Sequence, residues 1–159
     1  MTDFIVKINL PSPVDFVTLR QDTDWGVITR NQATKALVQS SCGVTAYDGN
    51  TVIGMARVIG DAVLNLFIQD VIVARPYRGK GVGEEIMQTL IAHLKQNYPA
   101  DCTVGLMAAK GQSGFYEHFG FENRPSDKTD AGMTASLGHL NCTSQKTVER
   151  LQRDKTTRA

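Results

Sequence analysis

The sequence has little charge imbalance and no long apolar run. It carries 17 Lys and Arg against 16 Asp and Glu, so its net charge is +1, which argues against a nucleic-acid binder driven by bulk positive charge. No apolar stretch approaches the length of a membrane span. The N-terminal residues lack the basic start and unbroken apolar segment of a signal peptide. We therefore expect neither nucleic acid nor a membrane as a partner.

Cysteine is also scarce. The three cysteines, Cys42, Cys102 and Cys142, are scattered and have no metal-ligand spacing. An odd, dispersed set is typical of free thiols in a reducing compartment, so we expect a cytoplasmic protein without a metal site. The length of 159 residues and the 42% hydrophobic content fit one globular domain. We expect this domain to cover residues 1–142, followed by a polar tail, 143–159.

The most informative stretch joins a strand to a helix through glycines. An apolar segment ends at Ala74, and the turn Arg78-Gly79-Lys80-Gly81-Val82-Gly83 leads directly into an amphipathic segment. Unpaired N–H groups and the positive end of the helix dipole meet at such a turn, so it can hold a phosphate. The spacing alone is equally compatible with an ordinary turn, because it matches neither the GxxxxGK[ST] loop nor GxGxxG, which needs glycine where Glu84 stands.

Periodicity and turn residues predict the other elements. We expect helices at 13–20, 31–40 and 81–98, the first two capped by Ser12 and Asn31, and a helix opened by residues 110–114 that ends near Phe119. The expected strands are 4–10, 43–47, 51–59, 63–74, 103–109, 120–123 and 133–137. The Asp48-Gly49-Asn50 turn predicts a hairpin, and the helical crossover predicts that strand 103–109 runs parallel to strand 63–74.

Asp70 interrupts an apolar strand face. Strict alternation places it beside Leu66, Ile68 and Ile72, where a carboxylate must be hydrogen-bonded or must raise its pKa. Two interpretations remain open: a structural carboxylate bonded to nearby backbone, and a general base or a carboxylate that orders a proton-relaying water. A β-bulge in this strand would reverse the face assignment.

The Arg-x-x-Gly-x-Gly turn, the strand before it and the later run Phe-Tyr-Glu-His-Phe-Gly-Phe at 115–121 resemble the GCN5-related N-acetyltransferases (GNAT). The likeness extends over residues 52–133. It implies an α/β (α+β) fold with a mixed, mostly antiparallel sheet of six or seven strands, two splayed parallel central strands and about four helices. It also implies direct acetyl transfer from acetyl-CoA in a ternary complex, without a metal.

The resemblance assigns roles to particular residues. Tyr116 would be the general acid, although a core tyrosine is the alternative reading of that position. The residues expected to contact acetyl-CoA or coenzyme A are Val71, Ile72, Val73, Arg78, Gly79, Lys80, Gly81, Val82, Gly83, Lys110, Ser113 and Tyr116. Many members carry asparagine near Lys110, which is a departure. Because the family has a bulge in the strand before the turn, Gln69 competes with Asp70 as the residue that faces the pocket. Gln69, Asp70 and Trp25 are the candidate acceptor-binding residues. Core packing is the alternative interpretation of Trp25.

The acceptor is open at this stage. We expect a small-molecule primary amine, such as an arylalkylamine, a polyamine or an amino sugar, and a protein lysine or N-terminal amine is the second choice. Two rival hypotheses are a non-catalytic acyl-CoA sensor and a nucleotide-binding regulator. The resemblance also allows a homodimer.

Overall fold

A single five-stranded sheet organises the fold. In the computed structural model of the chain, residues 3–134, 137 and 140 are described. The sheet order is β1-β2-β3-β4-β5, with antiparallel neighbours throughout except for the parallel pair β4 and β5. The strands are β1 (Ile5–Lys7), β2 (Cys42–Asp48), β3 (Thr51–Gly60), β4 (Asn65–Val73) and β5 (Thr103–Leu106).

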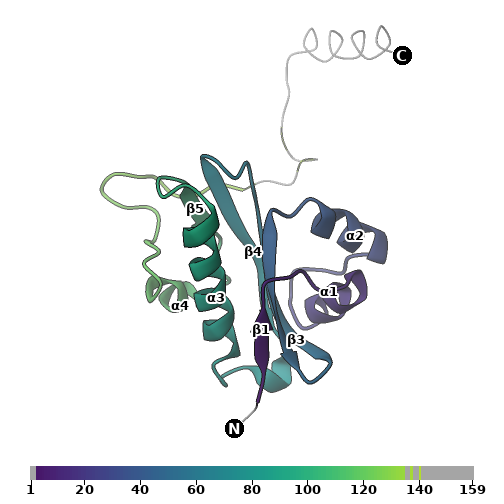
Figure 1. The fold of residues 1–159 in the computed structure, drawn as a ribbon. Coiled ribbons are helices and arrows are strands. Elements are labelled where there is room, and N and C mark those ends of the chain that lie inside the picture. The colour runs from purple at the N-terminus through teal and green to yellow at the C-terminus, as the bar shows by residue number, and fades with distance from the viewer. Residues whose placement is uncertain (1–2, 135–136, 138–139, 141–159) are drawn as a thin grey trace, which may run out of the picture. The chain divides into compact units, whose positions relative to one another are not determined.

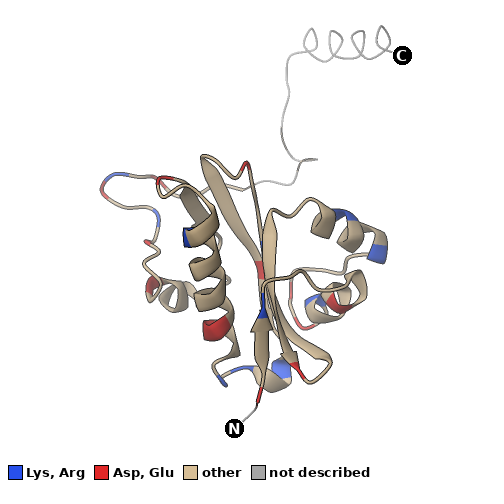
Figure 2. Ribbon diagram, in the orientation of Figure 1, with Lys and Arg blue, Asp and Glu red and all other residues tan. Residues whose placement is uncertain are grey.

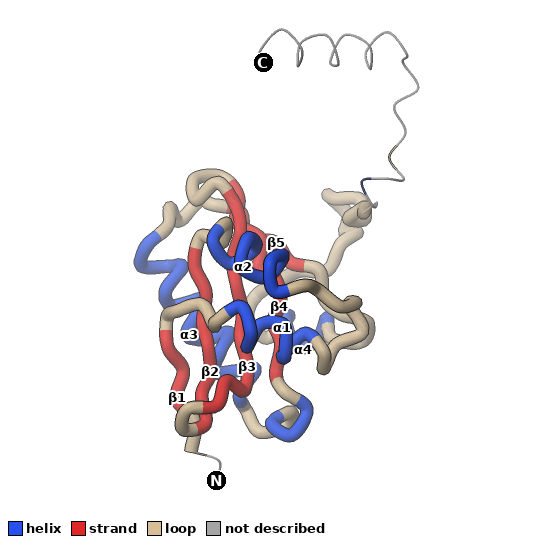
Figure 3. Tube along the Cα trace, turned by 90° about the vertical axis from the view of Figure 1, so that its right-hand side faces the viewer, coloured by secondary structure: helices blue, strands red, loops and turns tan. Residues whose placement is uncertain are grey.

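Helices cover both faces of the sheet. Figures 1 and 3 show α1 (Pro13–Arg20) and α2 (Arg30–Val38) on one face and α3 (Val82–Asn97) on the other, with the short α4 (Ser113–Glu117) on the α3 side. Between β4 and α3 lies a short 3₁₀ helix, η1 (Arg75–Tyr77). All these elements belong to the compact unit Met1–Phe121, and a second unit covers Glu122–Ala159.

Side-chain caps fix where the first two helices begin. The Ser12 hydroxyl accepts a hydrogen bond from the Asp15 N–H, as expected for the cap of α1. The predicted cap of α2 was wrong. Thr29, not Asn31, precedes the helix, and it forms a capping box in which its hydroxyl accepts from the Gln32 N–H and the Gln32 side chain accepts from the Thr29 N–H.

Two hydrophobic clusters lie on opposite sides of the sheet. The larger cluster joins β2, β3 and β4 to α3 and includes Leu66, Ile68, Ile86 and Leu90. The other joins β3 and β4 to α1 and α2 through Phe16, Leu19, Ala33, Leu37, Met55 and Ile72. Charged residues of both signs are interspersed over the helices and loops (Figure 2). Among the described residues, no helix is both long enough and apolar enough to cross a bilayer.

β4 contains a bulge that overturns the simple alternation expected for this strand. Met55 pairs with Ile72 and Arg57 pairs with Gln69, so Asp70 and Val71 together oppose the single residue Ala56. Asp70 has a φ of 49°. The extra residue reverses the faces: Leu66 and Ile68 pack with α3, whereas Ile72 packs with α1 and α2.

Other expectations are partly corrected. The mixed sheet and the parallel pair are confirmed, but the described residues form five strands rather than six or seven. Residues 120–123 do not form a strand, because Gly120 turns the chain with a φ of 88°. The expected strand 133–137 lies partly outside the described residues, and the tail 143–159 lies wholly outside them.

The β3–β4 turn sets where β4 begins. The Asp61 carboxylate accepts hydrogen bonds from the N–H groups of Val63, Leu64 and Asn65, and these bonds lower the pKa of Asp61. Gly60 has a φ of 148°, and a methyl group there would overlap the Asn65 carbonyl oxygen and lie 2.9 Å from the Leu66 Cα. Only glycine fits this position without moving the backbone.

We therefore expect Gly60→Ala to destabilise the fold by about 2 kcal/mol or more, because backbone must shift to admit the methyl group. The free energy of unfolding in urea measures this effect. Gly132→Ala is the matched control, since a methyl group at Gly132 meets nothing within 4 Å. Equal stability of the two variants would contradict the proposed role of Gly60.

Candidate active site

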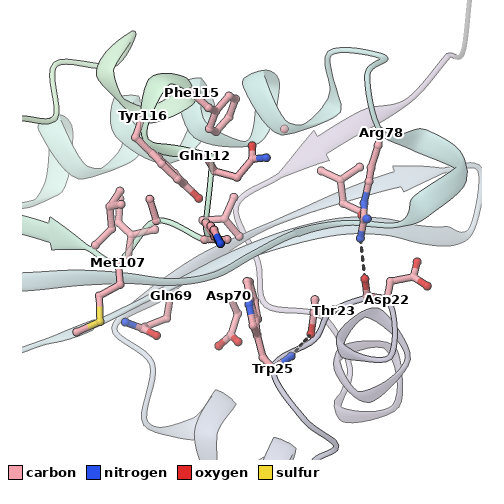
Figure 4. Close-up of a pocket in the computed structure, with 18 of the residues that line it drawn as sticks. Asp22, Thr23, Trp25, Gln69, Asp70, Arg78, Met107, Gln112, Phe115 and Tyr116 are labelled. Carbon is pink, nitrogen blue, oxygen red and sulfur yellow. Dashed lines mark hydrogen bonds between the residues drawn. The ribbon is translucent and has the colours of Figure 1, made fainter. Parts of the chain in front are cut away.

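A pocket of about 1050 Å³ opens where β4 and β5 stop pairing. The two strands pair from Asn65 with Thr103 to Ile68 with Leu106, and the residues that follow on each strand line the pocket (Figure 4). The other walls come from the α1–α2 connection, the glycine turn and α4. The predicted splay of two parallel strands is thus the origin of the pocket.

The glycine turn faces this pocket with its backbone. Gly79 and Gly81 have φ values of 73° and 80°, and both line the pocket together with Gly83. Gly81 is the N-cap of α3 and has no side-chain cap. Its carbonyl accepts the first helical bond, from the Glu85 N–H, so the N–H groups of residues 82–84 have no partner within the helix. This arrangement can bind an anion.

Two predicted cofactor residues of the turn do not line the pocket. The Lys80 ammonium lies over the Tyr77 ring, 5.5 Å from its centroid, and Val82 is buried in the α3 core. The Arg78 side chain lines the pocket, but its Nε donates to the Val73 carbonyl at 2.9 Å and its Nη2 donates to the Asp22 carbonyl at 2.8 Å. The turn therefore presents mainly backbone groups to a ligand.

The unpaired edge of β4 forms the next wall. The Ala74 N–H donates to the Ile53 carbonyl of β3, and backbone groups alternate in direction along a strand. Val71 and Val73 therefore direct their N–H and C=O groups away from β3, and both residues line the pocket. Ile72 instead packs in the α1–α2 core, so the structure does not bring it to the pocket.

Gln69 and Asp70 both reach the pocket because the bulge points them to the same side of β4 (Figure 4). The sequence analysis had treated Gln69 and Asp70 as alternatives for the residue that faces the pocket. The Asp70 side chain is only 4% exposed, and each of its oxygens accepts from an arginine: Arg20 Nη1 at 2.7 Å and Arg57 Nε at 2.5 Å. Two guanidinium groups therefore hold the carboxylate, which favours a structural role over proton abstraction.

Tyr116 lies across the pocket from these residues. Its side chain points into the space between α4 and β4 (Figure 4), and no hydrogen bond to its hydroxyl occurs within the described part of the chain. Burial raises the pKa of this phenol above its ordinary value, so it keeps its proton at neutral pH. Phe115 and Phe121 make edge contacts with the ring and fix its direction.

Of the remaining predicted site residues, some line the pocket and one does not. Trp25 and Lys110 line the pocket, whereas Ser113 does not. The sequence reading missed other lining residues, among them Arg20, Met107, Gln112 and Phe115. One signal for Arg20 was present: a buried carboxylate at position 70 requires a cationic partner. No comparable signal pointed to Met107 or Gln112, because their positions depend on where β5 ends.

A model of the acetyltransferase (GNAT) domain matches residues 21–136. The chain belongs to the GNAT acetyltransferase family. A solved structure of a probable acetyltransferase from meticillin-resistant Staphylococcus aureus is similar to it, with 30% identity and a TM-score of 0.75, covering 85% of this chain and 100% of that one. The pocket, the glycine turn and Tyr116 therefore lie in a GNAT domain.

Curated relatives match this GNAT chain over shorter spans. The histone acetyltransferase TAP1 of Glycine max is 34% identical over 88 residues, 55% of this chain and 37% of that protein. An uncharacterized ycf52-like N-acetyltransferase of Prochlorococcus marinus is 31% identical over 116 residues, 70% of this chain and 63% of that one. The chain thus spans less than two thirds of the length of these relatives.

Removing the Asp70 charge should destabilise the fold. We expect Asp70→Asn to cost about 3 kcal/mol or more in urea unfolding, because it leaves two largely buried guanidinium groups without their carboxylate. Asp24→Asn is the matched control, since Asp24 also lines the pocket but is exposed. A fully stable Asp70→Asn protein that has lost turnover would instead support the general-base reading.

Proposed function

We propose that this protein is an N-acetyltransferase that transfers the acetyl group of acetyl-CoA directly to a primary amine in a ternary complex. One observation carries the proposal: an uncapped helix N-terminus, an unpaired strand edge and a proton-bearing phenol all line the same pocket. These are the groups needed to hold a diphosphate, an amide-bearing arm and a leaving thiolate.

The fit to acetyl-CoA rests on backbone groups. The N–H groups at the start of α3 and the glycines 79, 81 and 83 would hold the diphosphate. The N–H and C=O groups of Val71 and the N–H of Val73 would pair with the amides of the pantetheine arm as an added strand does, whereas the Val73 carbonyl already accepts from Arg78. The Val71 N–H would then polarise the thioester carbonyl. Acetyl-CoA supplies the acetyl group in activated thioester form.

In the proposed reaction the protein itself transfers one proton, from Tyr116 to the leaving group. The amine nitrogen bonds to the acetyl carbon as the carbon–sulfur bond breaks, and the Tyr116 hydroxyl donates its proton to the departing thiolate. The raised pKa of Tyr116 suits this role, because burial disfavours the phenolate and the phenol stays protonated at neutral pH. The amine must arrive neutral. Since Asp70 is paired with Arg20 and Arg57, we propose that solvent water rather than Asp70 takes the amine's excess proton.

A small-molecule primary amine is the acceptor that the pocket supports best. Trp25, Gln69 and Met107 all line the pocket, and an aromatic ring, an amide and a thioether can surround a compact ligand. A protein amine is the second candidate, supported by the name of the Glycine max relative, a histone acetyltransferase.

We also propose a cytoplasmic location, because Cys42 and Cys102 are free thiols.

A panel of small amines and lysine peptides tests the function, with release of coenzyme A as the measured product. We expect acetyl-CoA-dependent turnover of at least one small amine. Turnover of peptides alone would move the assignment to protein acetylation. Acetyl-CoA binding without any turnover would favour a sensor, and equal thermal protection by ATP would favour a nucleotide-binding regulator.

The role of Tyr116 has its own test. We expect Tyr116→Phe to lower kcat about 100-fold, because the thiolate would depart without a proton donor. The Kd of acetyl-CoA, measured by calorimetry, should stay within about twofold, since the backbone holds the cofactor. Tyr47→Phe is the control: its hydroxyl accepts from the Asn9 side chain on the sheet and does not line the pocket. An unchanged kcat in Tyr116→Phe would remove this residue from the mechanism.

A further inference from the structure

The segment Asp22–Trp25, which we call the acceptor link, follows α1 and contributes all four of its residues to the pocket. It contains no helix or strand. Two of its backbone carbonyls, those of Asp22 and Trp25, accept hydrogen bonds from arginine side chains. Its position thus depends on hydrogen bonds, including these two to its main chain, and not on secondary structure of its own.

Arg20 makes the first of these contacts. Its Nη2 donates to the Trp25 carbonyl at 3.0 Å and its Nη1 donates to Asp70 at 2.7 Å. The guanidinium carbon also lies 5.8 Å from the centroid of the Trp25 ring. With a side chain that is only 16% exposed, Arg20 connects the end of the acceptor link to the bulge of β4.

Arg78 makes the second contact from the opposite side. Its Nη2 donates to the Asp22 carbonyl at 2.8 Å (Figure 4), while its Nε donates to the Val73 carbonyl at 2.9 Å. The Asp22 carboxylate adds a third contact by accepting from the Arg75 N–H at 2.8 Å. The start of the acceptor link is therefore attached to the end of β4 and to η1.

We infer that Arg20 and Arg78 are positioning residues that fix the acceptor link to the part of β4 that β5 does not pair with. Arg20 joins the Trp25 carbonyl to Asp70, and Arg78 joins the Asp22 carbonyl to Val73. The inference rests on the proposed function for its meaning in catalysis: the strand that would carry the pantetheine arm also sets the place of the amine. A guanidinium is needed at each position because its fork reaches two acceptors at once, which a lysine ammonium on a flexible stem does not reproduce.

This assignment changes the role expected of Arg78. The family resemblance had placed Arg78 among the residues that contact acetyl-CoA. Two of its donors already serve carbonyl groups, so its loss should affect the amine more than acetyl-CoA. The two roles predict opposite effects on the two substrates, and that difference makes them separable.

Trp25 is the one tryptophan in the chain, so its fluorescence reports the acceptor link directly. We expect acrylamide quenching of Trp25 to rise about twofold in Arg78→Gln and in Arg20→Lys, because releasing a carbonyl bonded to a charged group frees the link. Arg78→Lys should resemble Arg78→Gln, since charge alone does not bridge two carbonyls. Arg75→Gln is the control: it removes the same charge and only a 3.7 Å ion pair between a 66% exposed side chain and the Asp22 carboxylate, which contributes little, and it keeps the backbone N–H that Asp22 accepts.

The kinetic arm uses the same variants. The amine KM should rise about tenfold in Arg78→Gln, the size expected for losing a charge-assisted hydrogen bond, while the Kd of acetyl-CoA stays within about twofold. A large rise in that Kd with unchanged Trp25 quenching would overturn the inference and restore Arg78 as a diphosphate ligand. Arg78 is exposed, so this variant folds even if Arg20→Lys does not.

The two proposals fail separately. If the wild-type protein acetylates no amine in the panel, the proposed function fails, and Trp25 quenching still decides whether the arginines hold the link. If turnover is present but quenching and amine KM match those of Arg75→Gln in both variants, the positioning role fails while the acetyltransferase assignment stands.

Discussion

The bulge at Asp70 is the constraint on which the site depends. A non-glycine residue in the left-handed region costs about 1 kcal/mol, and aspartate is among the few types that tolerate it. The Asp70 carboxylate accepts from Arg20 and Arg57 in a setting where it is almost wholly buried. Such pairs add little net stability, because desolvation offsets their attraction. They instead define one backbone path, since any other would leave buried charges unpaired.

Because of the bulge, the two halves of β4 pack against different helices and differ in strand pairing. Before the bulge, Leu66 and Ile68 pack against α3, and the strand is paired on both edges. After it, Ile72 packs against α1 and the edge toward β5 is open. A regular strand would have placed Asp70 in the apolar α3 core. The bulge thus moves a carboxylate to a place with cationic partners and opens a backbone edge in the same step.

Sequence reasoning predicted correctly the features whose position is set locally. Gly79, Gly81 and Tyr116 line the pocket, and β4 and β5 are parallel, as a glycine turn, a recognisable motif and a helical crossover had indicated. The Thr29 cap was missed because threonine and asparagine compete as caps. The side of β4 on which Asp70 lies was not decidable from alternation, because a single extra residue reverses it. The partners of Asp70 lie 13 and 50 residues away along the chain.

The contacts that hold the acceptor link go mainly to backbone carbonyls, and this has a consequence for specificity. Arg20 and Arg78 bind the carbonyls of Trp25 and Asp22, groups that every amino acid provides. The Asp24 side chain can therefore differ without moving the main chain that carries it, whereas the Thr23 hydroxyl donates to the Arg20 carbonyl and accepts from the Trp25 N–H. Under the proposed function, Arg20 and Arg78 would set the place of the amine through the main chain of the link, and the exposed side chains of the link would read its identity.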